Sequence, residues 1–129
     1  MTDAVRGAPR SAVRDKSFAF AVRAVNAYKH ISAINREYVL SKQMLRSGTA
    51  IGALVREAEQ VESRRDFIHK LRVALKEAAE TEYWLLLLRD TRFLDPRAFA
   101  SLHRDLLELI RLLTSIINTT RLNKLTIDN

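Results

Sequence analysis

The sequence contains no cysteine and has few of the residues that break regular structure. The absence of cysteine excludes disulfides, thiol nucleophiles and thiolate-bound zinc. Three glycines and two prolines in 129 residues are too few for a turn-rich β protein or a disordered chain. No uncharged apolar run reaches the roughly 18 residues that a transmembrane helix needs, so no membrane span is expected. The N-terminal sequence also lacks the apolar centre of a secretory signal, which favours the cytoplasm.

Positive charge is in excess, and it is unevenly distributed along the chain. The formal net charge is +7. Residues 1–46 carry nine lysines and arginines against three acids, whereas residues 47–129 carry thirteen against twelve. Such asymmetry suggests a polyanionic partner, RNA or DNA. The alternative is a solvated surface that only keeps the protein soluble.

Four segments show the three- and four-residue apolar spacing of amphipathic helices. They span about residues 16–34, 38–60, 63–89 and 95–124. Ser63 is a suitable N-cap with Asp66 in the first turn, and Pro96 suits a first helical position. In the first helix, the expected core face consists of Phe18, Val22, Val25, Tyr28 and Ile31.

The absence of long linkers predicts one domain, an all-α, antiparallel, up-down-up-down four-helix bundle over residues 15–124. Residues 1–14 are expected to form a flexible basic arm, and residues 125–129 a C-terminal tail. The third helix is apolar over a wide arc, and the run from Trp84 to Leu88 is apolar all round. This apolar surface exceeds what one small bundle needs to bury, so we expect a homo-oligomer.

Gly48 and Gly52 lie four residues apart in the second helix, among other small side chains. Each glycine lowers helix propensity by about 1 kcal/mol relative to alanine, so the pair suggests a neighbouring helix that comes very close. In a bilayer, two glycines at this spacing promote helix dimerisation. Here Arg46 and Arg56 flank them, which favours close packing inside a soluble bundle.

A basic stripe on the third helix is the strongest functional candidate. Its four residues follow one another at steps of four, three and four, so they share one helix face: Arg65, His69, Arg72 and Lys76. Side chains at this spacing can follow a phosphate backbone. The alternative is a solvated face with internal pairs, such as Lys76 with Glu80. The charge excess of the N-terminal part adds three residues to the predicted nucleic-acid-binding set, namely Arg14, Lys16 and Arg23.

No set of residues indicates catalysis. The di-metal sites of helical bundles need a Glu-x-x-His step, and none of the three histidines has Glu three positions before it. Neither a metal nor another cofactor is therefore expected, and the acids are instead expected to form a pair of Glu57 or Glu80 with Arg46 or Arg56. The serines lack a histidine partner with an orienting acid, and no glycine-rich phosphate loop occurs.

Tyr83 and Trp84 are the aromatic residues that bear on nucleic-acid binding. Aromatic side chains stack on bases in proteins that bind single strands. These two lie between Glu82 and a run of leucines, so a position in the core or in a subunit interface is favoured.

Residues 43–84 carry an ordered set of short motifs, namely Arg46-Ser47-Gly48-Thr49, Ile51-Gly52-Ala53, Glu57-Ala58, Ser63, Asp66-Phe67, Lys70-Leu71, Ala74-Leu75-Lys76-Glu77-Ala78 and Glu80-Thr81-Tyr83-Trp84. Through these motifs the chain resembles the 23S rRNA intervening-sequence, or S23-like, proteins over about residues 14–122. The resemblance implies an antiparallel four-helix bundle and, as in several members, a ring of five subunits. The sequence departs from the usual pattern at Leu54, where many relatives carry Asn, and at Ala50, which is often Ser.

A related branch is the accessory protein of diversity-generating retroelements, which partners a reverse transcriptase and binds nucleic acid. Charge and resemblance together predict a non-enzymatic, cytoplasmic bundle that binds nucleic acid, as an accessory factor for a reverse transcriptase or another nucleoprotein complex. The alternative is a structural adaptor that binds a protein partner without nucleic acid. An enzyme is the third class, and no recognisable site supports it.

Overall fold

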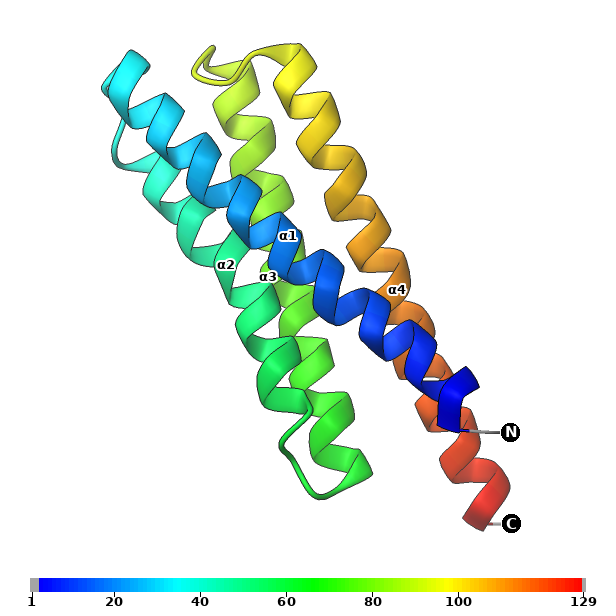
Figure 1. Cartoon of the computed structure of the whole chain (residues 1–129). Helices are drawn as coiled ribbons and strands as arrows, with labels where there is room; N and C mark the ends of the chain where they lie inside the picture. Colours follow the sequence, from blue (N-terminus) through cyan, green and yellow to red (C-terminus); the bar gives the residue numbers. More distant parts are fainter. Residues whose placement is uncertain (1–2, 129) are drawn as a thin grey trace.

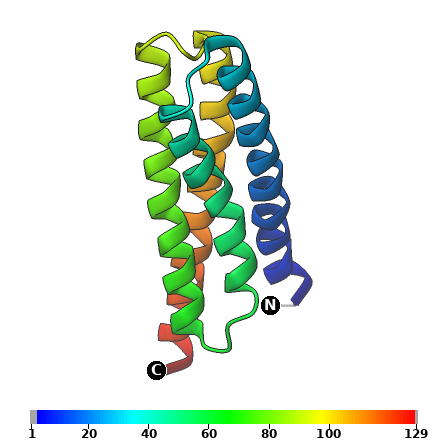
Figure 2. The ribbon, with the colours of Figure 1, turned by 90° about the vertical axis from the view of Figure 1, so that its left-hand side faces the viewer.

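The protein consists of four helices joined by short connections (Figures 1 and 2). The structure, a computed structural model, describes the backbone of residues 3–128 and the side chains of residues 8–123. Helix α1 spans Asp3–Asn35, α2 spans Leu40–Ala58, α3 spans Arg64–Asp90 and α4 spans Pro96–Asp128. The described residues contain no strand, which confirms the all-α four-helix bundle.

Each helix packs against two others. α1 and α3 both pack along α2 and α4, whereas the backbones of the diagonal pairs α1–α3 and α2–α4 do not come close to each other in the described part of the chain. In Figure 1, α2 returns along α1, α3 returns along α2, and the two chain termini lie at the same end. Because α1 and α3 are diagonal, the outer face of α3 lies on the side of the bundle away from α1.

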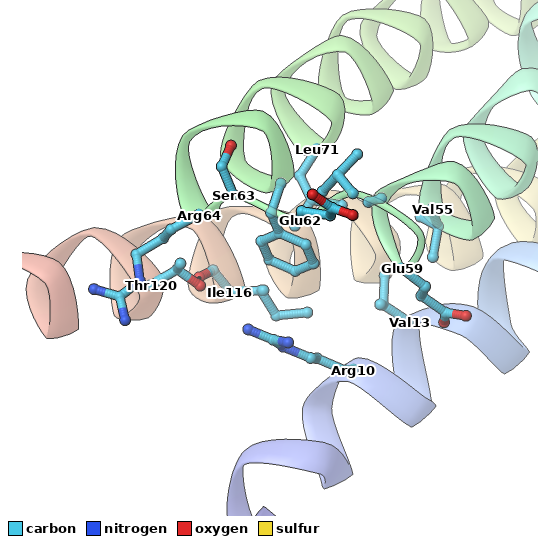
Figure 3. A pocket seen from close by; sticks show the side chains of 13 residues that line it. Arg10, Val13, Val55, Glu59, Glu62, Ser63, Arg64, Leu71, Ile116 and Thr120 are labelled. Carbon is cyan, nitrogen blue, oxygen red and sulfur yellow. Dashed lines mark hydrogen bonds between the residues drawn. The ribbon is translucent and has the colours of Figure 1, made fainter.

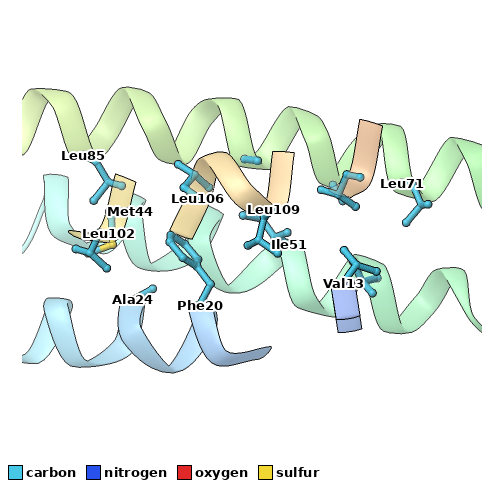
Figure 4. Close-up of a cluster of buried hydrophobic side chains, with 14 of the residues drawn as sticks. Val13, Phe20, Ala24, Met44, Ile51, Leu71, Leu85, Leu102, Leu106 and Leu109 are labelled. Carbon is cyan, nitrogen blue, oxygen red and sulfur yellow. The ribbon is translucent and has the colours of Figure 1, made fainter. Parts of the chain in front are cut away.

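The core is built from side chains at helical spacing on all four helices, as Figure 4 shows for Phe20, Met44, Ile51, Leu85 and Leu106. On α2, buried residues recur at three- and four-residue steps at Met44, Gly48, Ile51, Val55 and Ala58. The same spacing is buried on α4 from Leu102 to Thr120, and at its start Phe99 is in the core while Ala98 is exposed. Leu85 and Leu88 are fully buried within the single chain.

The predicted core face of α1 is wrong for three of its five residues. Phe18 is 60% exposed, and Val22 and Val25 are also exposed. The buried residues are instead Val13, Ser17, Phe20, Ala24 and Ile31. The reason lies in α2: a Cβ at Gly48 would come within 3.1 Å of the Ala24 Cβ, and one at Gly52 within 3.2 Å of the Ser17 carbonyl oxygen. So close an approach needs small residues on α1 at these two contacts, Ser17 and Ala24, and this orientation of α1 leaves Phe18, Val22 and Val25 on its outer face.

Two helix ends also lie further out than expected. α1 begins at Asp3, so residues 3–14 of the expected flexible arm are helical. Tertiary contacts stabilise this extension, because Val13 is buried and the Arg10 guanidinium lies 4.3 Å from the centre of the Phe67 ring. α4 continues to Asp128 because neither glycine nor proline follows Pro96, so the expected tail is helical up to that residue. Residues 1, 2 and 129 lie outside the described part.

The starts of α2 and α3 are fixed by side-chain caps. The Ser63 hydroxyl accepts a hydrogen bond from the Asp66 N–H at 3.0 Å, which confirms the predicted N-cap. At α2, the Glu37 carboxylate accepts hydrogen bonds from the N–H groups of Val39, Leu40 and Ser41, at 3.0, 2.8 and 2.8 Å. Burial by itself would raise the pKa of Glu37, but these backbone donors outweigh burial and lower it. This cap sets the first residue of α2 at Leu40 rather than at the expected Tyr38.

Candidate nucleic-acid interface

The outer face of α3 presents the basic stripe to solvent. Arg65, His69, Arg72 and Lys76 are all exposed. Within residues 8–123, the side chains of Arg65, His69 and Arg72 form no hydrogen bond or ion pair. Lys76 forms no ion pair with Glu80; after the hydrogen bonds from Arg46 and Trp84, its charge is the smallest of the causes that lower the pKa of that carboxyl. Arg65, Arg72 and Lys76 are therefore exposed cations without an ion pair among residues 8–123.

Three carboxylates of α3, those of Glu77, Glu80 and Glu82, pair with side chains of the neighbouring helices. On the α2 side, Arg46 pairs with Glu80 and, at 3.4 Å, with Glu77. On the α4 side, Glu82 lies 2.6 Å from His103 Nε2. Because Arg46 and then the Trp84 indole N–H bond to Glu80, the pKa of this carboxyl is lowered. Glu80 therefore stays ionised at neutral pH, beside the Arg46 guanidinium.

One of the expected acid–arginine pairs is present. Glu80 pairs with Arg46, as predicted. Glu57 lies 3.7 Å from Lys70 of α3 instead of an arginine of its own helix. Both pairs link α2 to α3, so these charged groups contribute to the register of the two helices.

The predicted binding residues of α1 are in a different situation from the stripe. The Arg23 guanidinium donates to Asp105 at 2.6 Å and to the Ser101 hydroxyl at 2.9 Å. Lys16 Nζ lies 2.8 Å from Glu108, and this hydrogen bond raises the pKa of the lysine. Arg14 lies 3.7 Å from Glu59. The structure thus does not bring the seven predicted residues together, because these three are engaged with α2 and α4, on the far side of the bundle from the stripe.

A pocket of about 400 Å³ opens at the end of the bundle where α2 meets α3 (Figure 3). Apolar residues of the core line it, among them Val13 on α1, Leu71 on α3 and Ile116 on α4. Two arginines and two glutamates lie around it, namely Arg10, Arg64, Glu59 and Glu62. Because both signs of charge are present, this pocket does not select a polyanion, and the outer face of α3 remains the stronger candidate.

Two further classes of site were considered in the described part of the chain. No group of histidine, aspartate and glutamate there is arranged to hold a metal ion. None of its helices combines the length and the hydropathy needed to cross a bilayer.

A family model described as 23S rRNA-intervening sequence protein matches residues 10–115. The chain belongs to this family. A similar solved structure is a protein of unknown function from the S23 ribosomal protein family of Bacteroides thetaiotaomicron. The two chains are 54% identical with a TM-score of 0.84, over 85% of this chain and 98% of the other. No curated protein matches the chain.

The motifs that carry the resemblance to the 23S rRNA-intervening sequence family have structural roles in this chain. Gly48 and Gly52 allow α1 to approach α2, and the buried Thr81 hydroxyl hydrogen-bonds to the Ser47 hydroxyl at 2.9 Å. Leu54, where the sequence departs from the family pattern, is partly buried against the core. The motif residues therefore serve mainly to pack the helices together. Most residues of the basic stripe are not part of these motifs.

Proposed function

We propose that this protein is a non-enzymatic nucleic-acid-binding bundle whose binding surface is the basic stripe of α3. The observation that supports the proposal is that unpaired cations lie on the outer face of this helix, whereas ion-paired carboxylates lie on its flanks. Arg65, Arg72 and Lys76 point to solvent without an ion pair in the described part of the chain, while the flanking carboxylates pair with Arg46 and His103. Such a line of exposed cations attracts phosphates.

The dimensions of the stripe suit one strand of nucleic acid. Arg65 and Lys76 are eleven residues apart, which is about 16 Å along a helix axis. At about 3.4 Å per nucleotide, this length matches roughly five phosphates of a stacked strand. Contacts to phosphates position a strand without reading its bases, so binding should depend little on sequence. The partner complex that we propose is a reverse transcriptase or another nucleoprotein assembly, following the resemblance to retroelement accessory proteins.

Replacing Arg65 and Arg72 together by Gln should weaken the binding of a fluorescein-labelled oligo(U) or oligo(dT). Two lost phosphate contacts should lower affinity roughly 10- to 30-fold at about 0.1 M salt. They should also reduce the slope of log K against log salt by about 1.4 for a single strand. Fluorescence anisotropy at several salt concentrations measures both quantities.

The matched control is Arg104→Gln with Arg111→Gln on α4. These two arginines are also exposed, also seven residues apart and also without an ion pair among residues 8–123. The control removes the same net charge, so equal losses in both double variants would show that only total charge matters. If the wild type fails to bind either oligonucleotide at low salt, the nucleic-acid function is wrong and the protein-adaptor alternative replaces it.

We also propose that the protein assembles as a homo-oligomer, with five subunits implied by the family resemblance. The run at Trp84–Leu88 is largely buried within one chain, so it no longer supports assembly. The support comes instead from the α1 apolar stripe, which consists of Phe18, Val22 and Val25. These side chains are 60%, 45% and 37% exposed on one helix face. Apolar side chains grouped in this way on a surface are typical of subunit contacts.

Light scattering should give a mass several times the 14.8 kDa of one chain. Val22→Lys, which places a charge inside the α1 apolar stripe, should shift the mass towards that of one chain. Ala19→Lys is the control, because this residue is exposed on the same helix but lies outside the stripe. A wild-type protein that is monomeric at micromolar concentration would contradict the proposed assembly.

A further inference from the structure

Tyr83 extends the basic stripe along the outer face of α3. It follows Lys76 by seven residues, or about two helical turns, which places it on the same helix face. The side chain is 58% exposed, so Tyr83 does not lie in the core of the chain. Two residues lie between them on this face, namely Ala79, which is exposed and small, and Glu80, whose carboxylate is engaged by Arg46 of α2.

The Tyr83 ring is supported by a chain of contacts that limits its motion. It packs edge-to-face against Trp84, with ring centroids 5.0 Å apart and an interplanar angle of 79°. The Trp84 indole N–H donates to Glu80 at 3.2 Å, and Glu80 is itself paired with Arg46 of α2. An exposed ring that is already oriented loses little conformational entropy when a ligand stacks on it.

We propose that Tyr83 stacks on an unpaired base, so that the ligand of the α3 face is single-stranded nucleic acid. This inference rests on the proposed function and specifies its substrate class. Lys76 and Tyr83 are about 10 Å apart along the helix axis, the length of roughly three stacked nucleotides. The strand therefore places phosphates on Arg72 and Lys76 and turns a base onto the ring. Bases inside a duplex are already stacked and paired, which excludes them from this position.

Tyr83→Leu and Tyr83→Phe separate stacking from other effects of the side chain. Leu keeps an apolar, helix-favouring residue but removes the ring, and should weaken oligo(U) or oligo(dT) binding about 5- to 150-fold. Phe keeps the ring and should bind within about twofold of wild type. Unlike the arginine variants, Tyr83→Leu should leave the slope of log K against log salt unchanged, because a stacking contact releases no counterions.

The single tryptophan provides a second readout. Trp84 packs against Tyr83, so a base that stacks there should change the tryptophan fluorescence of the wild type and of Tyr83→Phe. A duplex of the same length should bind more weakly than the single strand and should change the fluorescence less. Circular dichroism and light scattering of Tyr83→Leu should match the wild type.

The outcomes distinguish this inference from the proposed function. Unchanged affinity of Tyr83→Leu, with normal loss in the Arg65/Arg72 variant, would overturn the stacking role and leave phosphate binding in place. Duplex binding equal to single-strand binding would also overturn it. A changed oligomeric mass in Tyr83→Leu would show that the ring packs against a partner subunit instead. Absence of all binding by the wild type at low salt would overturn the proposed function itself.

Discussion

Phe20→Ala should destabilise the protein by about 3–5 kcal/mol, a large fraction of the stability of a small domain. Phe20 is 2% exposed and packs inside the bundle, where its ring lies 3.5 Å from the position of a Cβ at Gly48. Removing the ring loses its transfer free energy and leaves a cavity that neighbouring helices can only partly close. Urea denaturation followed by far-UV circular dichroism measures the change in the free energy of unfolding.

The matched control is Phe18→Ala, the same substitution two residues away on the same helix. Phe18 is 60% exposed, so its loss should change the stability of the subunit by less than about 0.5 kcal/mol. If Phe18 lies in a subunit contact, its effect should depend on protein concentration, whereas that of Phe20 should not. If Phe18→Ala destabilised the subunit more than Phe20→Ala, the packing described above would be wrong. The core face of α1 would then be the one with Phe18, as spacing alone predicts.

Helical spacing alone identifies the buried faces of α2 and α4, because most of their apolar residues recur along one side of each helix. α1 contains two interleaved apolar sets, and spacing does not choose between them. The buried set includes Ser17 and Ala24, which do not look like core residues. They are needed because α1 approaches the glycines of α2. The signal was present in Gly48 and Gly52, since a seam of small residues on one helix requires small residues on its neighbour.

The candidate site could be predicted only in part. Four-, three- and four-residue steps place Arg65 to Lys76 on one face whatever the tertiary fold. The pairing of the α1 bases could not be foreseen, because their partners are distant in sequence; Arg23 and Asp105 are 82 positions apart. The leucines that follow Tyr83 favour a position in the core or in a subunit interface. Its distance of seven residues from Lys76 would have assigned it to the basic face instead.

Gly52→Leu should destabilise the protein by about 1–3 kcal/mol, although leucine favours helix formation by nearly 1 kcal/mol over glycine. The added Cβ would lie 3.2 Å from the carbonyl oxygen and 3.4 Å from the carbonyl carbon of Ser17. These are backbone atoms of α1, which cannot rotate away as a side chain can, so the whole helix must shift. A hollow lined by Phe18, Ala21 and Ala53 can take part of the leucine side chain, which places the cost towards the lower end of the range. Thermal unfolding and urea titration measure it.

Gly52→Ala and Ala53→Leu separate the two opposing effects. Gly52→Ala adds only the Cβ, so the gain in helix propensity and the contact with Ser17 should nearly cancel. Ala53 is exposed on the next position of α2, so leucine there should be close to neutral. The free energy of unfolding of Gly52→Ala and of Ala53→Leu should therefore be close to that of the wild type, whereas that of Gly52→Leu should be lower. A melting temperature above wild type for Gly52→Leu would mean that propensity outweighs crowding, and hence that α1 does not approach α2 as closely as the Ser17 contact requires.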